Sequence, residues 1–398
     1  MKTILFLADG MADEPLEKLN GKTPLEYANT PAMDSIARKG ASGLFRTLPA
    51  GLPTSSDVAN MSVMGFLPEE NYPGRGPIEA VSQKIPLGPD DVAWRCNIIN
   101  VGKDGKIFDY SAGHIENEVS SQIIADLQKE FGSDKVTFYP GVSYRNLLVL
   151  HGKEFSKDVD YAKPDSSHGI DEYEIQPKPL TKEAEYTVEF LRDLYEKARV
   201  FLENHPLNQG KECPANRIWP WSPGYKPAFP MFLEKYSRKG AVISAVDVIK
   251  GIGICSNMDV IEVEGATGFI DTAYENKADA AVEALKDHDF VYLHVEGIDE
   301  VSHLGDLDLK IKAIEDFDSR LVGRVMKKLE GQDVRFVILP DHPVPILKRL
   351  HTTEPVPFAV CGPGIEADDV QTYSEKNAPS GRLGLLEKDE LMYFVLKD

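Results

Sequence analysis

Short apolar runs that end at an acidic residue recur along the chain. They cover residues 4–8 before Asp9, 242–246 before Asp247, 290–295 before Glu296 and 336–339 shortly before Asp341. Runs of this length are typical of strands that are buried on both faces of a parallel sheet. Helical patterns alternate with them, as over residues 30–40, where Thr30 is a candidate cap, Pro31 fits the first turn and Gly40 ends the helix. The alternation predicts a doubly wound α/β sheet.

The residue pattern changes between residues 109 and 210, where helices rich in Lys and Glu are predicted. The longest covers residues 183–204 and is amphipathic, with apolar residues at Val188, Leu191, Leu194, Ala198 and Phe201. Since strand-then-carboxylate segments flank this region on both sides, we expect an insertion into one core domain. The predicted core domain comprises residues 1–108 and 215–398, and the inserted, smaller α/β domain comprises residues 109–214. The proline-rich stretch 219–230 is the expected return hinge.

Composition narrows the classes of partner and compartment. The 398 residues leave room for two or three domains, and the net charge of −20 makes nucleic acid an unexpected partner. No apolar stretch of about 18 residues occurs, so no membrane span is predicted. The four cysteines show no C-x-x-C spacing and no disulfide framework. We expect free thiols and a cytoplasmic location; the oligomeric state is left open.

Aspartates and histidines follow several of the predicted strands. Asp299 and His303 are spaced i and i+4, so a helical turn would place both on one face. Asp341 and His342 follow a strand directly, and His351 lies nine residues further on. Together with Asp9 these residues supply three carboxylates and three imidazoles, a donor mixture that suits Mn²⁺ or Zn²⁺ better than Ca²⁺. The set is large enough for two ions, although each residue alone has an ordinary structural explanation as a cap or a solvated side chain.

A candidate nucleophile lies in the polar turn at residues 53–57, which leads into an apolar segment where a helix can begin. Helix N-termini favour anionic groups, and a metal ion activates a serine hydroxyl that is otherwise a poor nucleophile. The ordinary alternative is that Ser55 or Ser56 only caps the helix. If the helix starts near Asp57, Ser56 is its N-cap and faces the same crevice as the metals.

Two glycine motifs do not support a nucleotide cofactor. Gly21-Lys22-Thr23 resembles the end of a phosphate-binding loop but lacks the earlier glycine, and we predict an ordinary loop. Gly251-Ile252-Gly253 lacks the third glycine of a dinucleotide fingerprint, and we predict a turn.

The sequence resembles the cofactor-independent phosphoglycerate mutases of the archaeal type, within the alkaline phosphatase superfamily. The resemblance covers most of the chain outside the insert. It rests on Ala8-Asp9-Gly10-Met11, Lys22-Thr23-Pro24-Leu25-Glu26, Thr30-Pro31-Ala32-Met33-Asp34, Ser56-Asp57-Val58-Ala59, Gly74-Arg75-Gly76-Pro77-Ile78-Glu79-Ala80, Lys250-Gly251, Gly297-Ile298-Asp299-Glu300-Val301-Ser302-His303, Asp341-His342-Pro343 and His351-Thr352-Thr353-Glu354-Pro355-Val356-Pro357.

The resemblance implies an alkaline-phosphatase-like core, two divalent ions and a phosphoserine at Ser56. By the same match, Asp9, Ser56, Asp341 and His342 would surround one ion, and Asp299, His303 and His351 the other. His114, Arg145 and Lys250 resemble the family's phosphate and carboxylate binders, with a solvated side chain as the alternative for each. The implied activity is interconversion of 3-phosphoglycerate and 2-phosphoglycerate without 2,3-bisphosphoglycerate, with a small phosphorylated molecule as the partner.

The sequence departs from the family pattern at two places. Archaeal mutases carry a histidine four residues beyond the nucleophile, where this chain has Asn60. They also carry Arg-Gly-Ala-Gly where this chain has the tryptophan-containing stretch 217–224. The tryptophan version is similar to a bacterial branch with a proposed homoserine kinase role, so a phosphotransferase acting on homoserine is the alternative function. A metal-binding protein without turnover is a third possibility, and a sulfatase is disfavoured because no x-Pro-x-Arg context follows a Cys or Ser.

Overall fold

The computed structural model describes residues 1–397, which form two compact units. The first comprises Met1–Tyr72 and the chain from Ala228 to the C-terminus, and the second comprises Pro73–Pro227. The first unit therefore consists of two chain segments with the second unit inserted between them, as the strand pattern predicts. None of the described helices is long and apolar enough to cross a membrane.

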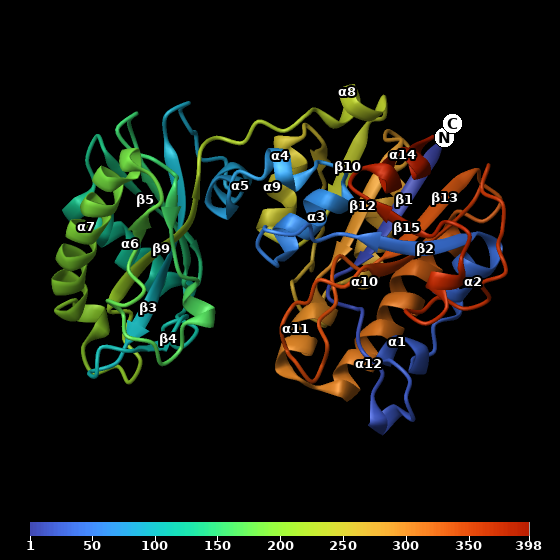
Figure 1. The fold of residues 1–398 in the computed structure, drawn as a ribbon, viewed down its shortest axis with the longest axis horizontal. Coiled ribbons are helices and arrows are strands. Elements are labelled where there is room, and N and C mark those ends of the chain that lie inside the picture. Colours follow the sequence, from blue (N-terminus) through green and yellow to red (C-terminus); the bar gives the residue numbers. More distant parts are fainter. Residues whose placement is uncertain (398) are drawn as a thin grey trace. The chain divides into compact units, whose positions relative to one another are not determined.

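An eight-stranded sheet organises the first unit, in the order β11-β10-β12-β1-β13-β14-β2-β15 (Figure 1). Among the described strands of this sheet, β14 alone is antiparallel to its neighbours. The four apolar runs of the sequence become β1, β10, β12 and β13, as predicted. The strands are β1 (Lys2–Ala8), β2 (Ala41–Arg46), β10 (Gly240–Ile243), β11 (Asp259–Val260), β12 (Phe290–Val295), β13 (Val334–Leu339), β14 (Val356–Cys361) and β15 (Leu385–Glu387).

Helices cover both faces of this sheet, because alternate side chains of each strand point to opposite faces. One face packs against α1 (Pro24–Tyr27), α2 (Pro31–Lys39), α10 (Tyr274–Ala284), α11 (Gly297–Leu304), α12 (Leu307–Asp316) and α13 (Gly323–Lys328). The other face packs against α3 (Ser56–Val63), α8 (Phe232–Tyr236), α9 (Asp247–Cys255) and α14 (Glu390–Leu396). A short helix, α4 (Pro68–Asn71), follows α3. The doubly wound α/β prediction is confirmed.

The second unit is a smaller α/β unit around a five-stranded antiparallel sheet. The order is β4-β3-β6-β5, and β9 also pairs with β3. The strands are β3 (Val92–Val101), β4 (Ile107–Asp109), β5 (Val136–Val142), β6 (Arg145–Leu150) and β9 (Arg217–Gly224), with a separate pair β7 (Val159–Asp160) and β8 (Lys178–Pro179). The helices are α5 (Arg75–Ser82), α6 (Asn117–Phe131) and α7 (Glu185–Glu203). The long amphipathic helix predicted at 183–204 is α7.

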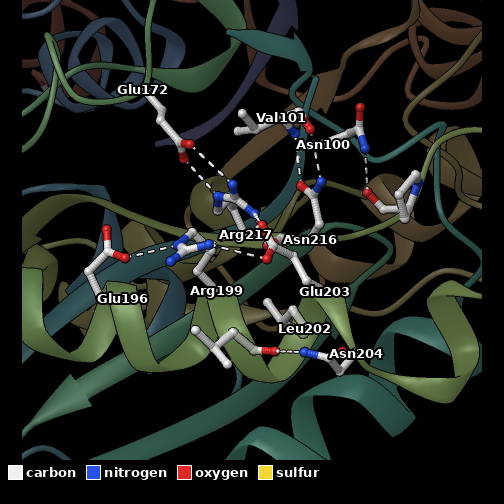
Figure 2. Close-up of polar contacts among 12 residues, drawn as sticks. Asn100, Val101, Glu172, Glu196, Arg199, Leu202, Glu203, Asn204, Asn216 and Arg217 are labelled. Carbon is white, nitrogen blue, oxygen red and sulfur yellow. Dashed lines mark hydrogen bonds and ion pairs between the residues drawn. The ribbon is translucent and has the colours of Figure 1, made fainter. Parts of the chain in front are cut away.

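Polar contacts tie β9 to its surroundings in the second unit (Figure 2). The Arg217 guanidinium donates through Nε to Glu172 at 2.7 Å and through Nη1 to Glu203 on α7 at 2.9 Å. The Asn216 amide exchanges two hydrogen bonds of 2.8 Å with the backbone of Val101 on β3. These buried, charge-assisted contacts fix β9 as a structural strand.

Three local predictions differ from the structure. The second unit begins at Pro73 and ends at Pro227, so the boundaries expected at 108/109 and 214/215 lie inside it. Residues 219–224 of the expected hinge belong to β9, whose eight residues are all buried. Gly251 and Gly253 lie within α9 and not in a turn. A Cβ on Gly253 would stand 2.8 Å from the Val242 side chain, so glycine here permits close packing of helix on strand.

Candidate metal centre

Three neighbouring parallel strands end at the candidate site. Since β1 lies between β12 and β13, their carboxyl ends meet at one edge of the sheet. Asp9 follows β1, and Asp341 and His342 follow β13. Asp299 and His303 lie on α11, which begins two residues after β12, so the predicted i, i+4 pair on one helical face is confirmed.

Ser56, the first residue of α3, lies at the same edge of the sheet, beside His342. Its Oγ lies 3.1 Å from Nε2 of His342. The helix begins at Ser56 itself, so the N-cap is Ser55 and not Ser56 as predicted. The Ser55 side chain makes no capping hydrogen bond and its buried Oγ has no partner among the described residues. Ser56 therefore occupies the first helical turn, where the positive end of the helix and the site residues converge.

Asp299, His303 and His351 form one group of potential ligands. The two histidine Nε2 atoms are 2.9 Å apart, and they lie 3.3 Å and 3.5 Å from the two carboxylate oxygens of Asp299. Nδ1 of His303 lies 2.9 Å from the Arg349 carbonyl oxygen. Because a carbonyl only accepts hydrogen bonds, Nδ1 carries a proton and donates. When the ring is neutral, its lone pair lies on Nε2, so His303 is oriented to act as a ligand toward the group.

A second group comprises Asp9, His342 and again Asp299. Nε2 of His342 lies 3.5 Å from Asp9 Oδ1 and 3.2 Å from Asp341 Oδ2. Asp341 is held by its other oxygen, which accepts from the backbone N–H groups of Gly10 at 3.2 Å and His342 at 2.8 Å. The seven predicted metal-site residues thus converge in the first unit, with Asp299 close to both groups.

Buried like charges dominate the electrostatics of this site. Burial, followed by the charges of Asp341 and Asp299, raises the pKa of Asp9 well above its usual range. Burial also raises the pKa of Asp341 to about 7. Burial opposes ionisation of Asp299 as well, but the hydrogen bond from His303 and the charge of His351 outweigh it and lower the pKa of Asp299 to about 2. Buried carboxylates that repel one another are stabilised either by protonation, as these pKa shifts indicate, or by a bound cation.

The residues present fit divalent ions. Oδ1 of Asp9 and Oδ1 of Asp299 are buried oxygens without a hydrogen-bond donor among the described residues. Buried acceptors of this kind are costly unless a cation or water satisfies them. Carboxylate oxygens and imidazole nitrogens are the donor set of Mn²⁺ and Zn²⁺ sites.

Sequence reasoning missed His294, which lies within β12 and is completely buried. Its Nε2 is 2.9 Å from Asp9 Oδ2, and its Nδ1 is 3.1 Å from the Ser244 hydroxyl. Burial lowers the pKa of His294 to about 3, so the ring is neutral. When Asp9 is ionised, as a ligand to a cation would be, it only accepts, so Nε2 then carries the proton and Ser244 donates to Nδ1. A histidine inside an apolar strand was the available signal.

The three predicted substrate binders lie in both units. In the second unit, His114 and Arg145 are exposed and flank Tyr144, the guanidinium lying 4.6 Å from the ring centre and the imidazole 6.4 Å from it. Lys250 lies on α9 of the first unit and pairs with Glu262 at 2.9 Å. The structure therefore groups His114 with Arg145.

Two arginines near Arg145 were also missed. Arg75 Nε and Arg95 Nη1 both donate to Glu79 Oε1 at 2.7 Å. Burial favours neutral Glu79, but Arg95 and Arg75 outweigh it and lower its pKa. Three arginines around one carboxylate leave an excess of positive charge in this part of a strongly acidic chain. Such an excess favours anionic ligands.

The two departures from the family pattern lie at buried positions. The Asn60 side chain is fully buried and contacts Ser56 and Asp341. Trp219 and Trp221 are buried in the core of the second unit, where Trp221 donates to Asn97 at 3.0 Å. Asn60 therefore contacts the metal centre, and an effect of the tryptophan-containing stretch on substrate recognition stays a prediction.

Comparisons with known proteins agree on one family. The family model of the Metalloenzyme superfamily matches residues 1–398. The chain is 46% identical to the 2,3-bisphosphoglycerate-independent phosphoglycerate mutase of Methanosarcina acetivorans, with 100% of each chain covered. It is also 46% identical, over 100% of each chain, to the probable enzyme of that name from Geobacter sulfurreducens.

Two solved structures match nearly the whole chain. The protein PH0037 from Pyrococcus horikoshii has 30% identity and a TM-score of 0.84, with 99% of this chain and 96% of that chain covered. The cofactor-independent phosphoglycerate mutase from Thermoplasma acidophilum has 28% identity and a TM-score of 0.67, with 100% and 99% covered.

Proposed function

Since the chain belongs to the Metalloenzyme superfamily, and within it to the family of 2,3-bisphosphoglycerate-independent phosphoglycerate mutases, we propose that it interconverts 3-phosphoglycerate and 2-phosphoglycerate. The observation that carries this proposal is the position of Ser56. Its hydroxyl lies 3.1 Å from His342 at the start of α3, beside the buried carboxylates of Asp9 and Asp341.

Ser56 is the proposed nucleophile. Its Oγ forms a bond to phosphorus while the bond from phosphorus to the substrate oxygen breaks, and that oxygen leaves as a hydroxyl with the proton that Ser56 gives up. The phosphoserine then gives the phosphoryl group to the other hydroxyl of the same glycerate, which restores Ser56. The isomerisation consumes no proton and no water. Water must therefore be kept from the phosphoserine until the second transfer.

The metal requirement follows from the ligand groups. Asp9, Ser56, Asp341 and His342 are the proposed ligands of one ion, and Asp299, His303 and His351 those of another. Divalent ions of this kind lower the pKa of a bound hydroxyl and offset the charge of the transferring phosphoryl group. Mn²⁺ or Zn²⁺ is the proposed metal because imidazole and carboxylate donors are mixed.

His114, Arg145 and Lys250 are proposed to hold the anionic groups of the substrate. Charge-assisted hydrogen bonds to carboxylate or phosphate suit guanidinium and ammonium groups. The excess of positive charge from Arg75, Arg95 and Arg145 around Glu79 supports this role for the second unit.

The experiment is an isomerisation assay on the purified full chain, stripped of metal and reloaded with Mn²⁺ or with Zn²⁺. We expect 3-phosphoglycerate to yield 2-phosphoglycerate when no 2,3-bisphosphoglycerate is added. Phosphorus NMR measures the two isomers over time. Two bound ions per chain with no isomerisation would refute the proposal. Homoserine as acceptor is not supported, because the relatives are named as phosphoglycerate mutases.

A further inference from the structure

Asn60 joins the nucleophile helix to the end of β13. It lies one helical turn after Ser56, and its side chain is completely buried. Its Nδ2 donates to the Ser56 carbonyl at 2.7 Å and to Asp341 Oδ2 at 2.9 Å. Its Oδ1 accepts from the Tyr292 hydroxyl of β12 at 2.5 Å. One amide therefore contacts three elements that meet at the site.

The orientation of this amide is fixed by chemistry. The Ser56 carbonyl can only accept a hydrogen bond, so the atom that faces it must be the nitrogen. Oδ1 then faces Tyr292, whose hydroxyl must donate. Burial, with Asp341 and Asp9 nearby, raises the pKa of Tyr292 well above its usual range, so the phenol keeps its proton. The Ser56 carbonyl thus sets the orientation of the Asn60 amide, and Tyr292 stabilises that orientation by donating to Oδ1.

We propose that Asn60, its orientation stabilised by Tyr292, is a positioning residue that fixes Ser56 and the Asp341 carboxylate for the metal. The backbone holds Oδ1 of Asp341, and Oδ2 lies 2.9 Å from the donating Asn60 amide and 3.2 Å from Nε2 of His342, so Asn60 is the shorter side-chain contact that directs Oδ2. Partners that orient ligands in this way are worth about 10- to 100-fold in metal affinity or activity. The inference rests on the proposed function, since it assigns Asp341 and Ser56 to one ion.

The test compares Asn60→Asp and Tyr292→Phe with the wild type. Asn60→Asp keeps the size of the side chain but puts an oxygen against Asp341 Oδ2 and the Ser56 carbonyl. We expect one of two Mn²⁺ ions to bind about 10- to 100-fold more weakly and kcat to fall by a similar factor, with KM unchanged. Tyr292→Phe removes only the donor to Oδ1 and should give a smaller loss of the same kind. Calorimetric titration of the metal-free protein with Mn²⁺ measures the affinities.

Ser62→Ala is the matched control, because Ser62 is buried on the same helix and donates only to the Val58 carbonyl at 3.3 Å. It should leave both Mn²⁺ affinities and kcat unchanged. Wild-type affinity and kcat in folded Asn60→Asp, or a loss confined to KM, would overturn the proposal. If Asn60→Asp does not fold, Tyr292→Phe decides by the same two readouts. A wild type that binds Mn²⁺ without isomerisation would refute the proposed function, while the Mn²⁺ affinities would still test Asn60.

Discussion

The metal centre and the Arg145 region are built in opposite ways. At the metal centre, Asp9, Asp341 and His342 have no exposed surface and come from the ends of adjacent parallel strands. In the second unit, His114 and Arg145 are exposed and rest on one tyrosine ring. The rigid sheet fixes the proposed metal ligands, whereas exposed side chains can adjust, which suits the role proposed for them of holding a substrate between two transfers.

Ser56→Ala should have the largest effect of any single change. Loss of the hydroxyl removes the covalent intermediate, so isomerisation should fall by about 10⁴-fold or more. Ser55→Ala is the matched control and should cost no more than about 1 kcal/mol of stability, since its hydroxyl makes no capping bond. Trapping the enzyme with substrate and mapping the phosphopeptide by mass spectrometry distinguishes the two. Label on Ser55, or wild-type turnover of Ser56→Ala, would contradict the mechanism.

Removal of a proposed metal ligand should have the second-largest effect on activity. His351→Ala leaves the proposed ion with only Asp299 and His303 from this group of ligands. We expect one of two ions to be lost and turnover to fall by about 10³-fold. The fold should persist, because His351 lies in a loop outside the sheet. His288→Ala is the control, since that histidine is not among the proposed ligands. It pairs with Asp259, with 2.8 Å between Nε2 and the carboxylate oxygen. Metal analysis of both purified variants makes the comparison, and two retained ions in His351→Ala would show that the ligand assignment is wrong.

Arg145→Ala tests the proposed role of the exposed residues of the second unit in substrate binding. We expect kcat/KM to fall by about 10- to 100-fold through a higher KM, the usual cost of a charge-assisted hydrogen bond. Metal content and labelling of Ser56 at saturating substrate should stay unchanged. Arg199→Ala in the same unit is the control, because that arginine pairs with Glu196 on α7 at 2.9 Å. Equal kinetics for the two variants would remove Arg145 from substrate binding.

The sequence predicts the metal centre better than the second unit, for a physical reason. Buried parallel strands give uninterrupted apolar runs, and the residue that ends each run marks the edge where ligands gather. In the second unit β9 carries two prolines, which suggested a hinge. It pairs with β3 on one side, and such an edge strand tolerates proline where a central strand does not.

Residues that act through contacts between distant segments were not predictable. Asn60 and Tyr292 are 232 positions apart, and His294 acquires its contact with Asp9 only through the register of β12 against β1. No local pattern encodes such pairs, because the partner is set by the assembled sheet. The i, i+4 pair Asp299 and His303 was predictable since one helix carries both.

The smallest expected effect is a pH dependence of the metal-free protein. Burial works against the imidazolium of His303, but Asp299 outweighs it and raises the pKa of His303 to about 9. Its unfolded pKa is about 6.5, so the folded protein binds more protons above that pH. The stabilisation is complete below pH 6.5 and is lost as the pH rises toward 9. Asp341, with its pKa raised to about 7, acts in the same direction.

We therefore expect the metal-free protein to lose about 1 kcal/mol of unfolding free energy between pH 6.5 and pH 8, a figure reduced for the partial exposure of His303. Lys277, with its pKa lowered to about 8 by burial, opposes the trend only at higher pH. Urea unfolding with a chelator present measures the slope. Saturating Mn²⁺ should reverse it, because metal binding requires deprotonated ligands and strengthens with pH. His303→Asn should flatten the metal-free slope, and an unchanged slope in that variant would rule out the His303–Asp299 pair as its source.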